Sequence, residues 1–224
     1  MTDRAKLGLS TAAAAAAIGF VLLASQSHRA DAATNVPPAA LTEPGNGNRE
    51  VAVLAGGCFW GVEAVYEHVK GVQDVTSGFA GKSARPATYS DVSSGTTGFA
   101  ESVRIVFDPK VVSYADLLRI LFAVVADPTQ VNRQGPDVGT QYRTAVFPQS
   151  PAQAKIARAY IAQLEQAHVF ARPIATKVET GRFVEAEAYH QDFMRKNPDH
   201  PYIVVHDKPK VADLKRQFPL SWRG

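Results

Sequence analysis

The sequence is poor in cysteine, because Cys58 is the only one among its 224 residues. One thiol cannot form an intrachain disulfide, which excludes a disulfide scaffold, and it cannot supply the spacing of a zinc finger. The formal net charge is only +3 and no long basic run is present, so nothing indicates a nucleic-acid partner. The 16 glycines and 14 prolines are ordinary usage, which excludes collagen and bulk disorder. Cys58 is therefore either an inert buried residue or the centre of the protein's chemistry.

The N-terminus has the features of an export signal. Arg4 and Lys6 supply positive charge, and the run from Leu7 to Ala24 is apolar and rich in alanine. Ala30-Asp31-Ala32 then matches the small-x-small pattern of a cleavage site. The apolar run is also long enough to cross a bilayer, so an uncleaved membrane anchor stays open beside a cleaved signal.

These features divide the chain into three parts. Residues 1–32 are expected to be a signal peptide or an uncleaved anchor. Residues 33–48 are polar and rich in proline and glycine, and are expected to form a disordered linker. Residues 49–224 are expected to form one folded domain. We therefore expect the protein to be exported, either to the periplasm or another extracytoplasmic site, or held on the inner membrane by its first residues.

Strands and helices are predicted to alternate along the folded domain. Short apolar or alternating runs predict strands at 51–55, 72–79, 103–107, 141–147 and 175–179. Apolar residues at helical spacing predict helices at 59–69, 113–125, 150–167 and 187–196. Two polar stretches, 78–98 and 126–140, are expected to be long functional loops, and the tail after 197 to be irregular. The order predicts an α+β fold: a two-layer α/β sandwich with a ferredoxin-like core, in which helices pack on a mixed sheet.

Two of these helices begin with recognisable caps. Ser113 and Asp116 resemble a capping box at the start of the second helix. Ser150 precedes Pro151 and is followed by Gln153, which is typical of a capped start with proline at the first helical position.

Cys58 lies where the first strand is expected to give way to the first helix. The glycines around it, Gly56, Gly57 and Gly61, permit a sharp turn and leave the approach to the thiol open. The free N–H groups of a helix start favour the thiolate, which is the nucleophilic form. Phe59 and Trp60 would form an apolar wall that suits a small apolar group of a substrate. Position alone leaves a buried structural cysteine as an equal alternative.

Four separated motifs, in the same order, resemble those of the A-type peptide methionine sulfoxide reductases. They are Gly57-Cys58-Phe59-Trp60-Gly61-Val62-Glu63, Pro86-Ala87-Thr88-Tyr89, Gly95-Thr96-Thr97-Gly98-Phe99-Ala100-Glu101 and Gly139-Thr140-Gln141-Tyr142-Arg143. The resemblance extends over about Val51 to Pro198. It implies an enzyme that reduces methionine-(S)-sulfoxide to methionine, in proteins, in peptides and free, and so repairs oxidative damage. Oxidised proteins and peptides are then its partners.

The resemblance also implies the roles of the matching residues. Cys58 is the nucleophile, and Glu101 is the general acid that protonates the sulfoxide oxygen. Glu101 then needs a raised pKa, which burial beside Phe59 and Trp60 would supply. Further roles fall on residues near these: Tyr89 and Tyr142 as hydroxyl donors, Asp137 as the loop aspartate, and Gly57, Phe59 and Trp60 as the receptor of the substrate methyl group.

The chain departs from the common family pattern in ways that affect recycling. A cysteine often found near Ser93 is absent, as are the resolving cysteines of the tail, so oxidised Cys58 has no internal partner. A sulfenic acid should form and be resolved by an external thiol, from a thioredoxin- or glutaredoxin-type protein or a small molecule. No prosthetic cofactor or metal is expected, and the protein is expected to be a monomer.

Several histidines of the family are also replaced. Phe99, Ala126 and Val138 stand where many members have histidine, so rate or pH dependence should differ. His190 matches a family histidine, although an ordinary surface position on a helix explains it equally well.

Two alternatives of other classes remain. The replaced histidines are consistent with a binding protein that recognises oxidised methionine but turns over poorly. A cysteine hydrolase would need a histidine base beside Cys58, and the first motif supplies none.

Overall fold

The computed structural model describes residues 35–45, 47–84 and 87–224. The expected signal or anchor segment, 1–32, lies outside these residues, as do Thr34 and Asn46 in the expected linker. The residues described belong to one compact unit, Ala33–Gly224. Among them, no helix combines the length and the apolar character needed to cross a membrane.

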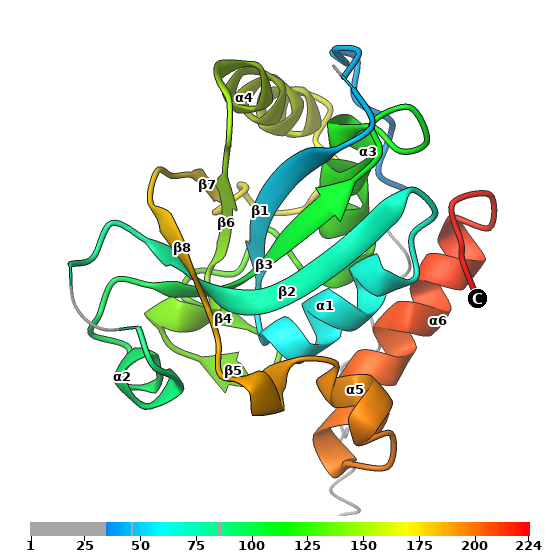
Figure 1. Cartoon of the computed structure of the whole chain (residues 1–224). Coiled ribbons are helices and arrows are strands. Elements are labelled where there is room, and N and C mark those ends of the chain that lie inside the picture. Colours follow the sequence, from blue (N-terminus) through cyan, green and yellow to red (C-terminus); the bar gives the residue numbers. More distant parts are fainter. Residues whose placement is uncertain (1–34, 46, 85–86) are drawn as a thin grey trace, which may run out of the picture. The chain divides into compact units, whose positions relative to one another are not determined.

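A six-stranded sheet forms the centre of the described fold, with the order β7-β6-β1-β3-β2-β8 (Figure 1). Its neighbouring strands are antiparallel except for β6 and β7, which are parallel, so the sheet is mixed as expected. The strands are β1 (Glu50–Gly56), β2 (Val72–Gly81), β3 (Ala100–Phe107), β6 (Thr144–Phe147), β7 (Lys177–Val178) and β8 (Arg182–Glu185). A separate two-stranded hairpin consists of β4 (Arg133–Gln134) and β5 (Asp137–Val138).

The four inner strands have the connectivity of a ferredoxin-like core. In chain order, β1 leads through helix α1 (Phe59–Glu67) to β2, then β3, then through α3 (Tyr114–Ile120) to β6. In space these strands lie in the order β6-β1-β3-β2. The predicted α+β sandwich with this core is therefore confirmed.

The helices cover one face of the sheet. One large apolar cluster joins that face to α1, α3 and α4 (Pro151–Gln166), and includes Leu54, Ile105, Tyr66, Leu117 and Tyr160. A small cluster around Val53, Ala145 and Phe147 covers part of the other face. The main core is thus a two-layer structure in which α1 is held rigidly against the sheet.

Both predicted helix caps are present. Ser113 Oγ accepts the Asp116 backbone N–H at 3.0 Å and Asp116 Oδ2 accepts the Ser113 backbone N–H at 3.2 Å, which completes a capping box. Ser150 Oγ accepts the Gln153 backbone N–H at 3.1 Å at the start of α4, with Pro151 in the first turn. After α3 the chain continues in a π-helical turn, Leu121–Val125.

The expectation of a disordered linker is wrong for residues 35–45. Val36 is buried, and its carbonyl accepts a hydrogen bond from Arg119 Nε at 2.8 Å. The Tyr160 hydroxyl donates to the Pro37 carbonyl at 2.6 Å. Pro37 and Pro38 have no N–H to donate, but backbone carbonyls of this segment accept hydrogen bonds from side chains of α3 and α4, and the Ala40 N–H donates to Gln163 Oε1 at 2.8 Å.

The stretch expected to be a loop at 78–98 is partly regular. Strand β2 continues to Gly81, and a short helix, α2 (Tyr89–Ser93), follows with Thr88 as its N-cap. Gly78 lies within β2, and a glycine is needed there because a Cβ would collide with the Val184 carbonyl of β8. The glycine that resembles a loop residue is therefore one that allows two strands to approach.

The second expected loop, 126–140, holds the β4–β5 hairpin, and a 3₁₀ turn (Thr140–Tyr142) then precedes β6. The helix expected at 187–196 is divided into a 3₁₀ turn (Ala188–His190) and α5 (Phe193–Lys196).

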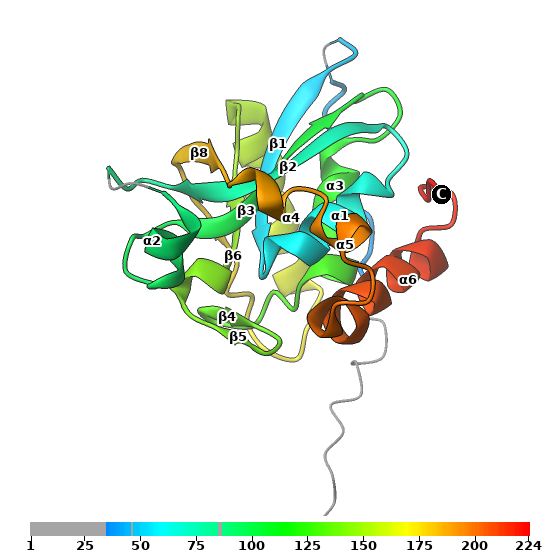
Figure 2. The same cartoon turned by 60° about the horizontal axis from the view of Figure 1, so that its bottom comes forward.

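The tail, expected to be irregular, is mostly helical. After α5 a π-helical turn (Ile203–Asp207) leads directly into α6 (Lys208–Gln217). Ile203, Asp207, Val211 and Leu214 are buried, at the three- and four-residue spacing of a helix that packs along one face. Figures 1 and 2 both show α5 and α6 beside α1. The end of the chain therefore covers the helix that begins at Cys58.

Candidate active site

Cys58 is the N-cap residue of α1, directly after β1 ends at Gly56. Its side chain is buried, with 8% of the residue exposed. Gly57 has φ of +95°, a left-handed conformation that favours glycine, and a Cβ there would lie 2.7 Å from the Gln134 side chain. The strand-to-helix turn therefore depends on glycine at this position.

Burial is the main influence on the Cys58 thiol. It raises the pKa well above the ordinary cysteine value, and the negative charges of Glu101 and Asp207 raise it further. The Trp60 backbone N–H at the helix start and the Lys210 ammonium act in the opposite direction. The backbone N–H at the helix start does favour the thiolate, as expected, but desolvation outweighs it in the free protein, so the pKa of Cys58 is raised.

Glu101 lies on β3 and is almost fully buried, with 2% exposed. Its Oε2 accepts the backbone N–H of Phe59, the residue that follows Cys58, at 3.0 Å. The carboxyl therefore lies at the same turn as the thiol. Burial raises the pKa of Glu101 to about 8, with a smaller contribution from Asp137. The carboxyl is therefore protonated near neutral pH and able to donate a proton.

Two tyrosines from separate elements share this electrostatic environment. Tyr89 begins α2, and its backbone N–H donates to Glu187 Oε1 at 2.9 Å. Tyr142 ends the 3₁₀ turn before β6. Burial and then Glu101 raise the pKa of both hydroxyls, and Cys58 also contributes. Both hydroxyls therefore remain protonated donors that interact with the thiol and Glu101. Pro86, which belongs to the same motif as Tyr89, lies outside the described residues.

Asp137 enters the site from the β4–β5 hairpin. Its Oδ2 accepts a short hydrogen bond from the Tyr202 hydroxyl, at the start of the π-helical turn. Asp137 also raises the pKa of Glu101 and of Tyr142. The hairpin and the C-terminal segment are thereby joined across the site.

The aromatic wall is built around Phe59 and Trp60. Phe59 is buried, with ring centroids 5.0 Å from His190 and 5.7 Å from Phe79. Trp60 stacks on Phe193 at 3.7 Å between ring centroids, and its Nε1 donates to His190 Nδ1 at 3.1 Å. His190 is buried, so it is not a surface helix residue but the partner that fixes the indole. Among the described residues, no histidine forms a hydrogen bond with Cys58, as a hydrolase base would.

The comparisons with known proteins agree with this geometry. The model of the family described as peptide methionine sulfoxide reductase matches residues 50–221. The chain belongs to this family. The peptide methionine sulfoxide reductase MsrA 2 of Mesorhizobium japonicum is 52% identical over 174 residues, 77% of this chain and 89% of that protein. The MsrA 2 of Synechocystis sp. is 50% identical over 189 residues, 84% of this chain and 87% of that protein. These relatives place the chain in the A-type group.

Solved structures of the family have the same fold. Reduced Mxr1 from Saccharomyces cerevisiae superposes with a TM-score of 0.60 at 33% identity, and covers 72% of this chain and 92% of its own. Methionine sulfoxide reductase A of Corynebacterium diphtheriae gives a TM-score of 0.58 at 33% identity, and covers 73% of this chain and 83% of its own.

The three residues that replace family histidines have different surroundings in this reductase. Phe99 is buried beneath the Arg182 guanidinium, which lies 5.1 Å from the ring centroid. Ala126 is buried, whereas Val138 is exposed on the hairpin next to Asp137. Ser93 ends α2, and its carbonyl accepts from Gln141 Nε2 at 3.3 Å.

The C-terminal segment contributes residues that the sequence motifs do not identify. Tyr202, Asp207 and Lys210 all act electrostatically on the reductase site, because Cys58 raises the pKa of Tyr202 and both Asp207 and Lys210 act on that of Cys58. The helical spacing of Ile203, Val211 and Leu214 was the available signal that this segment is folded.

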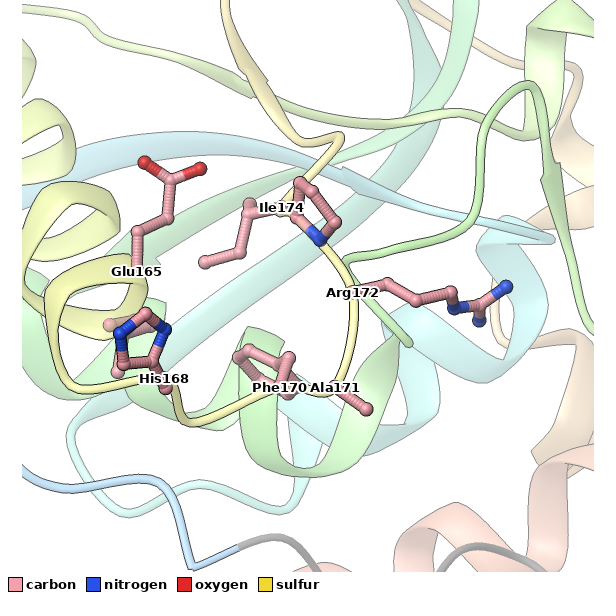
Figure 3. A pocket seen from close by; sticks show the side chains of 8 residues that line it. Glu165, His168, Phe170, Ala171, Arg172 and Ile174 are labelled. Carbon is pink, nitrogen blue, oxygen red and sulfur yellow. The ribbon is translucent and has the colours of Figure 1, made fainter.

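A separate hollow of about 330 Å³ lies at the end of α4 and in the loop after it (Figure 3). Its lining residues are Leu164, Glu165, His168, Phe170, Ala171, Arg172, Pro173 and Ile174. None of the residues matched to the reductase motifs lines it, so it is not the substrate site.

Proposed function

We propose that Cys58 is the nucleophile and Glu101 the proton donor of this peptide methionine sulfoxide reductase. The protein reduces methionine sulfoxide to methionine. One observation supports the assignment above all: the protein's single thiol and a protonated buried carboxyl meet at the same turn, joined through the Phe59 backbone N–H.

In the first step the Cys58 thiolate attacks the sulfur of the sulfoxide. Glu101 delivers its proton to the sulfoxide oxygen, which is otherwise a poor leaving group. The sulfur–sulfur bond formed in the attack and the sulfur–oxygen bond of the substrate then break as the oxygen passes to Cys58 and a sulfur–oxygen bond forms there, giving methionine and a cysteine sulfenic acid. The substrate sulfur is reduced by two electrons and Cys58 is oxidised by two, so the step balances.

The protonation of Glu101 also assists the nucleophile. The ionised Glu101 carboxylate raises the pKa of Cys58, so a neutral Glu101 removes one obstacle to forming the thiolate. The enzyme form that is ready to donate a proton is thus also the form in which the thiol ionises more easily.

The neighbouring side chains hold the substrate. The hydroxyls of Tyr89 and Tyr142 donate hydrogen bonds to the sulfoxide oxygen and stabilise its developing charge. Phe59 and Trp60 receive the methyl group, and the glycine at position 57 keeps the thiol accessible. Asp137, held by Tyr202, orients the hairpin side of the site.

Recycling uses an external thiol. An attacking thiolate forms a mixed disulfide with Cys58 and releases water, and a second thiol then frees Cys58 as the other product disulfide forms. The single cysteine supports this route, because the chain offers no second thiol. A thioredoxin- or glutaredoxin-type protein or a small thiol would serve as donor.

A reductant-free reaction tests this cycle. An excess of methionine sulfoxide should yield one equivalent of methionine per chain and then stop, with dimedone trapping the oxidised Cys58. Dithiothreitol should restore turnover. Repeated turnover without a thiol would contradict the proposal, and a protein that binds the sulfoxide without forming methionine would instead support the poorly active binding protein. Running the assay on each sulfoxide epimer tests the preference for the S form.

We also propose that the enzyme works outside the cytoplasm. The charged start, apolar run and Ala30-Asp31-Ala32 pattern support export. Mass spectrometry of the native protein should find an N-terminus near Ala33 in an extracytoplasmic fraction. An intact Met1 in the membrane fraction would favour the anchor, and an intact Met1 in the cytoplasm would contradict export.

A further inference from the structure

The C-terminal segment places a buried ion pair against the first turn of α1. Asp207 is completely buried at the end of the π-helical turn, and its Oδ1 lies 3.2 Å from Lys210 Nζ in α6. A Cβ at Gly61 would collide with Asp207 Oδ1 and would lie 3.2 Å from Lys210 Nζ. The glycine at position 61 is therefore the site at which both charges reach the helix backbone.

This contact point is close to the thiol. Gly61 lies three residues after Cys58, and residues three apart on a helix are neighbours on one face. Trp60, the residue before Gly61, also contacts Tyr202 at the beginning of the same C-terminal segment, with ring centroids 6.0 Å apart. The segment from Tyr202 to Lys210 is thus docked on the first turn of α1, at Trp60 and Gly61.

Packing alone does not explain a charged pair at this place. Burying two charges costs more free energy than filling the same space with apolar side chains, and a buried ion pair seldom repays that cost in stability. Asp207 Oδ2, moreover, has no hydrogen-bond partner among the described residues. The Lys210 side chain is only 21% exposed, so its ammonium is directed at Asp207 and α1 and not at bulk solvent.

We propose that Asp207 and Lys210 are positioning residues of opposing charge that together set how readily the Cys58 thiol ionises. Lys210 favours the thiolate, and Asp207 both anchors the ammonium and opposes the thiolate. The proposal rests on Cys58 being the nucleophile, as proposed above.

Other charged and titratable groups interact with the thiol or with Asp207. Those that interact with Cys58 are Glu101 from β3, Tyr89 from α2, Tyr142 from the 3₁₀ turn and Tyr202 at the start of the π-helical turn. Asp137 from the hairpin and His206 from the π-helical turn act on Asp207. Because Glu101 is neutral below about pH 8, the contributions of Asp207 and Lys210 are clearest there. Below the pKa of the thiol, the alkylation rate of Cys58 follows the thiolate fraction, and Cys58 is the chain's single thiol.

The test is iodoacetamide alkylation of the full-length reduced protein between about pH 6 and about pH 9, in the wild type and four variants. K210Q should slow alkylation roughly 3- to 10-fold, and D207N should accelerate it by a similar factor, because a nearby charge shifts ionisation in opposite directions according to its sign. K210R, which keeps the charge, should stay near the wild type. K208Q is the matched control, since Lys208 is on the same helix but lies 3.9 Å from Asp199 and is 43% exposed.

A purely structural role predicts a different result. Loss of packing would change alkylation in the same direction in K210Q and D207N, and K210R would resemble K210Q. Either pattern, or equal rates in K210Q and the wild type, would overturn the proposal. If D207N does not fold, as judged by thermal unfolding, the comparison of K210Q with K210R decides alone. Because alkylation is measured without substrate, its outcome is independent of whether C58S lacks reductase activity.

Discussion

Two buried glutamates show how similar electrostatics can have different consequences. Glu101 on β3 and Glu63 on α1 are each 2% exposed, and burial raises the pKa of each to about 8. Glu101 faces the thiol, two tyrosine hydroxyls and the Phe59 backbone N–H. Glu63 instead adjoins Glu67 and Asp192, which raise its pKa further.

Among the described residues, the surroundings of Glu63 include hydroxyl groups but no thiol. It lines a cavity of about 350 Å³ together with other carboxylates, among them Asp74 and Glu185, and its Oε2 has no hydrogen-bond partner among the described residues. A raised pKa therefore marks burial at both positions, and it becomes catalytic only where a thiol and a substrate wall are also present. Cys58, which interacts with Glu101 and not with Glu63, is where this difference should have its largest effect.

C58S should abolish methionine sulfoxide reduction while leaving the fold intact. Serine has nearly the same volume, but its hydroxyl is a far weaker nucleophile than a thiolate toward the sulfoxide sulfur. Methionine formation in the presence of dithiothreitol measures the loss, and circular dichroism checks the fold. Turnover retained in this variant would remove the thiol from the mechanism.

E101Q should lower turnover by roughly 10²–10⁴-fold, the usual contribution of a positioned proton donor. Glutamine keeps the size and can still accept the Phe59 N–H, but it cannot deliver a proton. E63Q is the matched control, since it makes the same change in an equally buried glutamate, and its rate should stay within about threefold of the wild type. Equal losses in the two variants would show that burial, and not proximity to Cys58, determines the effect.

The rate of methionine formation should stop increasing with pH near about 8. Below that pH the rate should increase with the thiolate fraction of Cys58, whose pKa burial raises, and above it the loss of the Glu101 proton should offset further ionisation of the thiol, so that the rate levels off. Single-turnover measurements, which exclude the recycling thiol, would record this change of slope. E63Q should leave it in place, and a rate that keeps increasing to about pH 10 would contradict the acid role of Glu101.

The sequence predicts the parts of this fold and site that depend on local signals. The β1–α1 junction at Cys58, the capping box at Ser113 and the capped start of α4 depend on neighbouring residues, and the structure has each of them. The tail was not predicted because charges and Pro209 interrupt the apolar pattern of α6, which becomes regular only when α1 covers its buried face.

The electrostatics of the site required the tertiary structure. The helix start at Cys58 is visible in the sequence, but the depth of burial that outweighs it is not. Likewise, Asp207 and Lys210 reach Gly61 only through the docking of a segment far away in the sequence. The motifs identify which side chains to consider, whereas packing decides their ionisation.

A further expected effect separates stability from activity. The pKa of each glutamate is raised from 4.5 unfolded to about 8 folded, so the folded state binds the proton more tightly. The stability that each contributes is fully present below about pH 4.5 and is lost as the pH increases through about 8. E63Q and E101Q should each remove this loss, worth on the order of 5 kcal/mol across that window. Each variant should therefore gain stability relative to the wild type as the pH increases.

Urea unfolding at about pH 5 and about pH 9 measures that gain, with K208Q as a variant that should show none. E63Q should then combine a flatter stability profile with nearly normal reductase activity, and E101Q the same flatter profile with almost no activity. If E63Q kept the wild-type dependence of stability on pH, Glu63 would not be the buried proton-binding group described here, and its comparison with Glu101 would fail. If both variants flatten the profile, the catalytic difference between them arises from position alone, because the cost of burying the carboxylate is then the same for each.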